Sequence, residues 1–72
     1  MTANIQIMVN GEKRDVPVGL GVTGLLSHLG LPADRVAIER NLEILPRSQW
    51  ISTAVQGGDR YEIVQLVGGG SL

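Results

Sequence analysis

The sequence RYEIVQLVGGG at residues 60–70 decides the fold, because it joins a predicted strand directly to a run of glycines. Within this strand, predicted over residues 60–67, Tyr61 and Ile63 lie on one face and Glu62 and Val64 on the other. Such alternation is typical of a half-buried strand. The turn residues Gly57-Gly58-Asp59 precede it. The strand therefore ends a folded unit, and the glycines leave from its end.

A β-hairpin is predicted at the beginning of the chain. Residues 4–9 alternate between polar and apolar side chains, as a half-buried strand does. Asn10-Gly11 follows, a pair that favours a tight hairpin turn because both residues tolerate positive φ. Val16 and Val18 then lie on one face of a second strand. Pro17 lacks a backbone N–H, so this strand is expected at an edge of the sheet.

An amphipathic helix is predicted between Gly21 and Gly30. Either Gly21 or Thr23 can cap its beginning, and Gly30 suits the left-handed residue at its end. The apolar residues recur at i, i+3, i+4 and i+7, which gives one apolar stripe: Val22, Leu25, Leu26 and Leu29. A helix of about two turns is not stable alone in water, so we expect it to pack on the strands.

Two further strands are predicted between the helix and the last strand. Residues 36–39 alternate and predict a third strand, and residues 41–43 a turn. Ile44-Leu45 is expected to form a short strand. Residues 48–54 are irregular in pattern, with Trp50 as the expected apolar anchor.

The order of these elements predicts an α+β fold of the β-grasp type. It consists of a mixed sheet of four to five strands with one helix packed on one face. The first and last strands are expected to pair in parallel, because a long crossover that contains the helix separates them. Residues 1–67 are assigned to this domain and residues 68–72 to a flexible glycine tail.

Composition excludes several classes of function. The chain has 72 residues, which predicts one domain, with no cysteine and a single histidine, His28, so no metal site is expected. A net charge of −1, one Trp, one Tyr and no Phe argue against binding to nucleic acid. The chain contains no run of 18 apolar residues, so no membrane span is predicted. The N-terminal residues lack a signal-peptide pattern, so the cytoplasm is the expected location.

Enzyme chemistry has little support in the sequence. No acid, histidine and serine are spaced as a recognisable triad, and a core this small leaves little room for a substrate pocket. Glu39, Glu43 and Glu62 are expected on neighbouring strands, where they would form a solvated face of the sheet. Gly19-Leu20-Gly21 precedes the helix but lacks the G-K-[ST] ending of a phosphate loop.

The glycine tail is the strongest candidate for function. Gly68, Gly69 and Gly70 have no side chains, so the tail can thread a narrow channel in a partner protein. It would carry a terminal carboxylate into an active site of that partner. Val64 and Leu66 are expected to point away from the helix, and together with Val67 they are candidate partner contacts beside the tail.

Two stretches resemble the ThiS family of sulfur carriers in thiamine thiazole biosynthesis. One is RVAIERNLEILPR at residues 35–47 followed by Trp50, and the other is GDRYEIVQLVGGG at residues 58–70. The opening Asn10-Gly11-Glu12 and the pair Leu25-Leu26 also fit. The resemblance covers nearly the whole chain and implies a ubiquitin-like β-grasp fold.

The resemblance also implies a reaction at Gly70. In the family, an ATP-using partner, ThiF, adenylates the carboxylate of the last glycine. A persulfide sulfur from a cysteine desulfurase system replaces AMP, and thiazole synthase, ThiG, accepts sulfur from the resulting thiocarboxylate. The carrier itself would be no enzyme, would bind no cofactor, and would contribute Gly68 and Gly69 as the threading tail.

One feature departs from the family pattern, in which the active form ends at glycine. Here Ser71 and Leu72 follow Gly70, and an amide-bonded Gly70 has no free carboxylate. We therefore expect the competent form to end at Gly70 after loss of these two residues. The alternatives are a carrier of the molybdopterin-synthase small-subunit type and a ubiquitin-like binding module whose tail does no chemistry.

Overall fold

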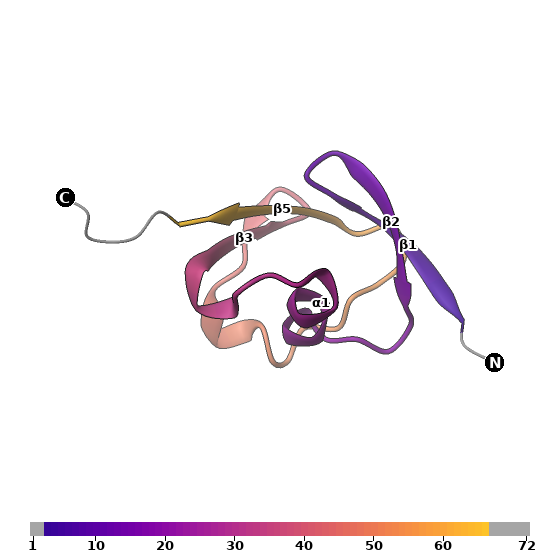
Figure 1. Ribbon diagram of the computed structural model, residues 1–72, viewed down its shortest axis with the longest axis horizontal. Helices are drawn as coiled ribbons and strands as arrows, with labels where there is room; N and C mark the ends of the chain where they lie inside the picture. Colours follow the sequence, from indigo (N-terminus) through magenta and orange to yellow (C-terminus); the bar gives the residue numbers. More distant parts are fainter. Residues whose placement is uncertain (1–2, 67–72) are drawn as a thin grey trace.

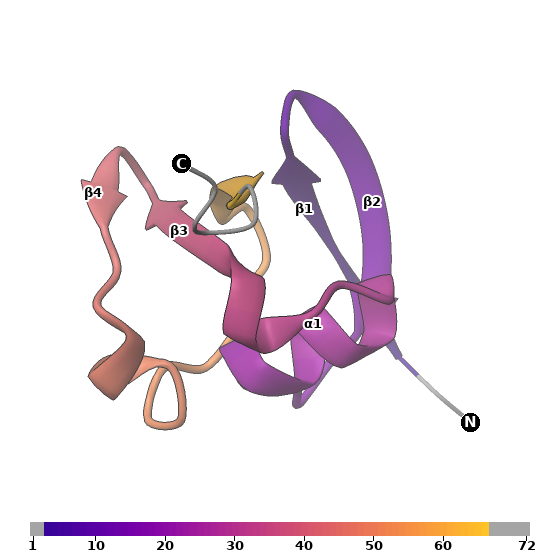
Figure 2. The ribbon, with the colours of Figure 1, turned by 60° about the vertical axis from the view of Figure 1, so that its left-hand side comes forward.

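A five-stranded mixed sheet carries one helix on one face in the computed structural model, which describes residues 3–66 (Figure 1). The strands are β1 (Asn4–Val9), β2 (Glu12–Pro17), β3 (Val36–Arg40), β4 (Glu43–Ile44) and β5 (Arg60–Gln65). The helix is α1 (Val22–Leu29), and two 3₁₀ turns are η1 (Ala33–Arg35) and η2 (Arg47–Gln49). The strand order β2-β1-β5-β3-β4 confirms the predicted β-grasp. Figure 2 shows α1 beneath the strands.

The first and last strands pair in parallel at the centre of the sheet, as predicted. Met8 lies beside Arg60 and Val9 beside Tyr61. The Asn10 side chain then continues this pairing beyond the end of β1. Its Oδ1 accepts a hydrogen bond from the Ile63 N–H at 2.7 Å, and its Nδ2 donates to the Ile63 carbonyl at 3.1 Å. The hairpin turn is thereby fixed to the middle of β5.

The β1–β2 turn has the conformation that its sequence predicts. Asn10 and Gly11 have φ of 51° and 83°, which is the left-handed region that a two-residue hairpin requires. The β3–β4 turn uses the same region at Asn41 (φ 52°) and Leu42 (φ 72°). A leucine in this conformation is unusual, because its Cβ crowds the backbone.

The helix begins and ends at the predicted glycines. Gly21 is its extended N-cap and Gly30 its left-handed C-cap, with φ of 74°. Val22, Leu25 and Leu26 are fully buried, which confirms the predicted apolar stripe. In the part of the chain that the structure describes, no helix has the length and apolar character needed to span a bilayer.

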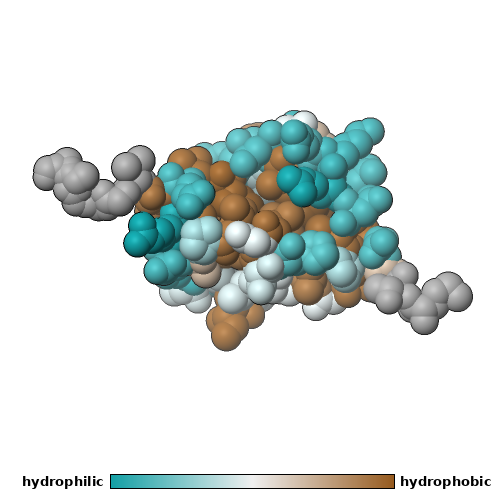
Figure 3. Space-filling view, viewed as in Figure 1, coloured by the Kyte–Doolittle hydropathy of each residue, from teal (hydrophilic) through white to brown (hydrophobic). Residues whose placement is uncertain are grey.

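The core lies between the helix and the inner face of the sheet, and apolar side chains fill the space between β5 and α1 (Figure 3). Trp50 closes one side of it. Its side chain is buried, and its indole N–H donates to the Leu45 carbonyl at 3.0 Å. This confirms Trp50 as the anchor of the irregular segment. The buried residues are Ile7, Val9, Val16, Val22, Leu25, Leu26, Val36, Ile38, Trp50, Val55, Tyr61 and Ile63.

Four strand boundaries differ from the predictions, and the third strand extends to Arg40 rather than ending at residue 39. The second strand ends at Pro17, and Val18 is exposed rather than on the face of Val16, because the chain turns at Val18 and Gly19. The short strand is Glu43–Ile44 and not Ile44-Leu45, although the Leu45 N–H still donates to the Ile38 carbonyl of β3 at 2.9 Å while its side chain packs against the core. The last strand ends at Gln65. The predicted domain boundary between residues 67 and 68 lies outside the described residues.

Candidate functional site

The predicted reactive tail begins where the described chain ends. Val67, Gly68, Gly69 and Gly70, together with Ser71 and Leu72, lie outside the described residues. The last described residue, Leu66, is still hydrogen-bonded at the end of the sheet, since its N–H donates at 2.6 Å to the carbonyl of Arg35, the residue before β3. The chain is therefore fixed beside β3 up to Leu66, the residue that precedes the predicted tail contact Val67.

The face of β5 that points away from the helix is apolar near its end. Val64 is 59% exposed and Leu66 is 52% exposed, while Tyr61 and Ile63 are buried in the core. This confirms the predicted orientation of both sets of side chains. Two of the three predicted contact residues are therefore accessible, and the third, Val67, lies outside the described residues.

The sheet brings further residues to this surface that the sequence analysis did not assign to it. Ala37 lies directly opposite Val64 across β3 and β5, and Ile44 lies opposite Glu39 across β3 and β4. Ile44 is 74% exposed. We call the resulting depression the outer-face groove; it has a volume of about 100 Å³ and is lined by Ala37, Ile38, Glu39, Ile44, Glu62 and Val64.

The carboxylates expected on a solvated sheet face do lie on neighbouring strands. Glu39 and Glu62 are direct partners across β3 and β5, and Glu43 is exposed on β4. Glu62 is exposed, whereas Glu39 is half-buried. Glu39 and Glu62 share the outer face and border the outer-face groove, whereas Glu43 is the partner of Arg40 and lies on the other face, so the prediction of one surface for all three carboxylates is wrong for Glu43.

A second depression, the edge groove, adjoins the outer-face groove and shares Ala37, Ile38 and Ile44 with it. It has a volume of about 290 Å³ and is lined by Val36, Ala37, Ile38, Ile44, Leu45, Pro46, Arg47, Trp50 and Leu66. The Arg47 guanidinium stacks over the Trp50 ring at 4.4 Å from its centroid and also donates to the carbonyls of Ala33 and Val36. Leu66 thus lies beside apolar surface that adjoins the beginning of the tail.

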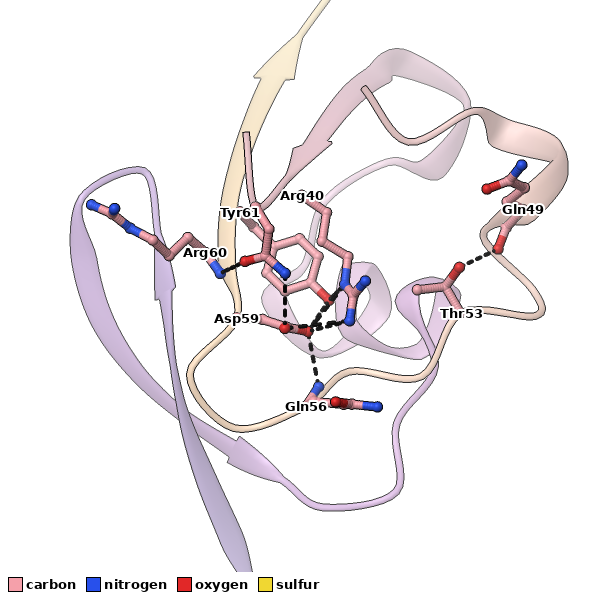
Figure 4. A network of polar contacts seen from close by, with 8 residues as sticks. Arg40, Gln49, Thr53, Gln56, Asp59, Arg60 and Tyr61 are labelled. Carbon is pink, nitrogen blue, oxygen red and sulfur yellow. Dashed lines mark hydrogen bonds and ion pairs between the residues drawn. The ribbon is translucent and has the colours of Figure 1, made fainter. Parts of the chain in front are cut away.

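A buried polar cluster fixes the beginning of β5. The Asp59 carboxylate is 6% exposed and accepts hydrogen bonds from Arg40 (3.1 Å), the Tyr61 hydroxyl (3.0 Å), Asn41 (3.2 Å) and the Gln56 N–H (2.9 Å). Figure 4 shows Arg40 and Tyr61 converging on it. The sequence patterns predicted Asp59 in a turn and Tyr61 on one face of the last strand, but not that both side chains meet Arg40. The hydrogen-bond partners of the carboxylate all belong to the turn and strands that it joins, so the cluster stabilises the fold.

The cluster also shifts the protonation of its members. Burial would by itself raise the pKa of Asp59, but the hydrogen bonds from Gln56, Asn41 and Tyr61 and the Arg40 charge hold that pKa below its ordinary value. Burial, together with the hydrogen bond to Asp59, raises the pKa of Tyr61 to about 12.

We expect alkaline pH to destabilise the protein through Tyr61. Its pKa is raised from 10.0 in the unfolded chain to about 12 in the folded protein. The contribution of Tyr61 to the free energy of unfolding is complete below pH 10. It falls by up to about 3 kcal/mol as the pH rises through the pKa that Tyr61 has in the folded protein. Urea denaturation from about pH 9 to 12 measures it. Tyr61→Phe should have a flatter pH dependence over this range; an unchanged dependence would contradict the assignment.

The other side chains that could take part in catalysis or metal binding do not form a cluster among the described residues. His28 is exposed on α1. Among residues 3–66, no three side chains of the His, Cys, Asp or Glu type lie close enough together to hold a metal ion. What these residues do offer is an apolar surface beside a strand that leads into glycines. These features define the class of small β-grasp domains whose last strand is followed in the sequence by a run of glycines.

The comparisons with known proteins agree with this class. The model of the ThiS family matches residues 5–70. The sulfur carrier protein ThiS of Escherichia coli is 33% identical over 92% of this chain and all of its own length. The crystal structure of the thiamine biosynthesis protein ThiS from Geobacter metallireducens is similar, with a TM-score of 0.77 and 38% identity over 92% of this chain and 100% of that one. The chain belongs to the ThiS family, whose members include proteins named sulfur carrier protein and thiamine biosynthesis protein.

A longer relative connects the family to thiazole synthase. A protein of Paramagnetospirillum magneticum named thiazole synthase is 45% identical over 93% of this chain. The chain spans about a fifth (21%) of the length of that relative. A segment similar to this carrier is therefore part of a polypeptide that bears the name of the synthase.

Proposed function

We propose that this chain carries sulfur as a thiocarboxylate on Gly70 and delivers it to thiazole synthase. The observation that carries the proposal is the position of the glycines. The family match extends to residue 70, the last glycine of the run, and the described part of β5 leads directly towards it. Gly68 and Gly69 then serve as the threading part of the tail.

The chemistry divides between the carrier and its partners. A carboxylate is a poor acyl donor, so a ThiF-type enzyme first converts it with ATP into an acyl adenylate and releases pyrophosphate. The terminal sulfur of a persulfide, supplied by a cysteine desulfurase relay, displaces AMP. A thiol then cleaves the S–S bond of the acyl disulfide, which leaves the thiocarboxylate. The carrier needs no cofactor of its own, and ATP is a substrate of the partner.

The tail is long enough to enter a partner while the domain stays outside. The four residues from Val67 to Gly70 extend at most about 14 Å. Glycine lets the backbone approach the walls of a narrow channel closely. The docking contacts proposed for the domain are Val64 and Leu66, with Val67 beside them, and the exposed Ile44 extends this surface.

We expect Ile44→Asp and Val64→Asp each to weaken binding to the partner enzymes at least tenfold without unfolding the domain. Both side chains are largely exposed, so the fold loses little, whereas a carboxylate in an apolar contact is costly. Ile51→Asp is the matched control, because Ile51 is 86% exposed on a loop away from this face. Titration calorimetry and thermal unfolding measure the two effects. Equal affinities for all three variants would contradict the proposed surface.

A reconstituted reaction tests the proposal as a whole. The chain ending at Gly70, charged with sulfur and supplied as the only sulfur donor, should support product formation by thiazole synthase. Molybdopterin synthase with its own small subunit removed provides the comparison for the alternative acceptor. Sulfur transfer to the second enzyme and not to the first would contradict the proposal. The cytoplasmic location stays a prediction.

A further inference from the structure

The outer-face groove places two carboxylates where the fold gives them nothing to bind. Glu39 and Glu62 are direct partners across β3 and β5, on the face that points away from the helix. Like charges directly opposite one another destabilise a sheet. Among residues 3–66 the ion pairs are Arg14 with Glu12 and Arg40 with Asp59, so neither of the facing carboxylates is neutralised by a cation of the described chain.

Apolar side chains flank this pair of charges. Glu39 has Ile44 as its partner on β4, and Val64 follows Glu62 by two residues on β5, with Ala37 opposite Val64. The groove of about 100 Å³ between them is therefore apolar along its walls and negatively charged at one end. A long side chain with an aliphatic stem and a cationic end matches both properties, as Lys and Arg do.

We propose that the outer-face groove receives a Lys or Arg side chain of thiazole synthase. The stem packs against Ile44 and Val64, and the cation lies between the carboxylates of Glu39 and Glu62. This rests on the proposed function and adds the charged contact that selects the partner. Charge complementarity of this kind contributes to specificity and to the association rate.

Two observations favour the synthase as the occupant. The groove is lined by Glu62 and Val64 of β5, and Val64 is only two residues from the last described residue, so this face is close to the point from which the tail starts. In the Paramagnetospirillum magneticum relative, a segment similar to this carrier is joined to a protein named thiazole synthase. A carrier-like segment and the rest of a protein named thiazole synthase can therefore occur in one polypeptide, where they are close enough to make such a contact.

The test compares the binding of three carriers, each ending at Gly70, to a thiazole synthase that has no carrier-like segment of its own. They are the unsubstituted chain, Glu39→Gln/Glu62→Gln, and the control Glu12→Gln/Asp15→Asn. The control removes the same charge from β2 at the opposite edge of the sheet. Affinities are measured at about 0.05 M and about 0.5 M salt, because exposed charge pairs are screened at the higher concentration.

The Glu39→Gln/Glu62→Gln carrier should bind at least about tenfold more weakly at low salt, and its affinity should depend less on salt. Its melting temperature should stay the same or rise, because the facing charges are gone. The control should bind as the unsubstituted chain does. Equal binding by all three carriers overturns the charged contact and leaves the proposed function in place. Failure of the unsubstituted chain to bind overturns both.

Discussion

Replacing Asp59 by alanine is expected to lower the free energy of unfolding by about 3–5 kcal/mol, the range typical when one partner of a buried ion pair is removed. The Asp59 carboxylate binds Arg40, Asn41, Tyr61 and the Gln56 N–H, so its removal leaves the buried Tyr61 hydroxyl and three part-buried donors without this acceptor. A small domain has a total stability of about 5–15 kcal/mol, so the variant should be close to unfolded.

Urea denaturation at neutral pH measures this loss. Asp34→Ala is the control, because Asp34 is exposed in η1, and it should change stability by no more than about 0.5 kcal/mol. Asp59→Asn retains the shape of the side chain but not its charge, so it should fall between the two. The same unfolding midpoint for Asp59→Ala and the unsubstituted chain would contradict the assigned role.

Acid unfolding should depend on the same residue. The pKa of Asp59 is lower in the folded protein than its ordinary value of 3.8. Its contribution is therefore complete above that value and is lost as pH falls through the lower folded pKa. Below about pH 4, Asp59→Asn should accordingly lose stability less steeply than the unsubstituted chain.

Adenylation is expected for a chain that ends at Gly70 and should fall to background for a chain that retains Ser71 and Leu72. In the longer chain the carbonyl carbon of Gly70 is part of an amide, and no free carboxylate is present at that glycine to attack ATP. A chain ending at Gly69 should also react poorly, because the tail is shorter by about 3.5 Å.

The measurement is pyrophosphate release by the ThiF-type enzyme with each of the three chains. Circular dichroism provides the control, since residues 3–66 are the same in all of them and the fold should not change. Comparable adenylation of the chain ending at Leu72, with both residues still present by mass after the reaction, would contradict Gly70 as the acceptor.

The elements that local sequence signals encode could be predicted. Asn10-Gly11 specifies a turn by its own conformational preferences, and the spacing of Val22, Leu25 and Leu26 specifies the buried stripe of α1. The alternation in residues 60–65 placed Tyr61 and Ile63 in the core. Each of these depends on neighbours within a few positions of the chain.

The features that long-range pairing creates could not be predicted. Ile44 joins Val64 on one surface only because β3 separates their strands in this particular register. Asp59 meets Arg40 across 19 positions of sequence, and neither residue signals the other. Val18 follows the alternating pattern but is exposed, because Gly19 turns the chain at that point. Leu42 adopts a left-handed conformation that its residue type disfavours.

The most direct test of sulfur transport by this chain is the intact mass of the protein ending at Gly70 after reaction with a ThiF-type enzyme, ATP and a persulfide donor. We predict a mass increase equal to the replacement of one oxygen by one sulfur, with fragmentation placing the sulfur on the carboxyl carbon of Gly70. An unchanged mass with active partner enzymes, or a sulfur located elsewhere in the chain, would contradict the account.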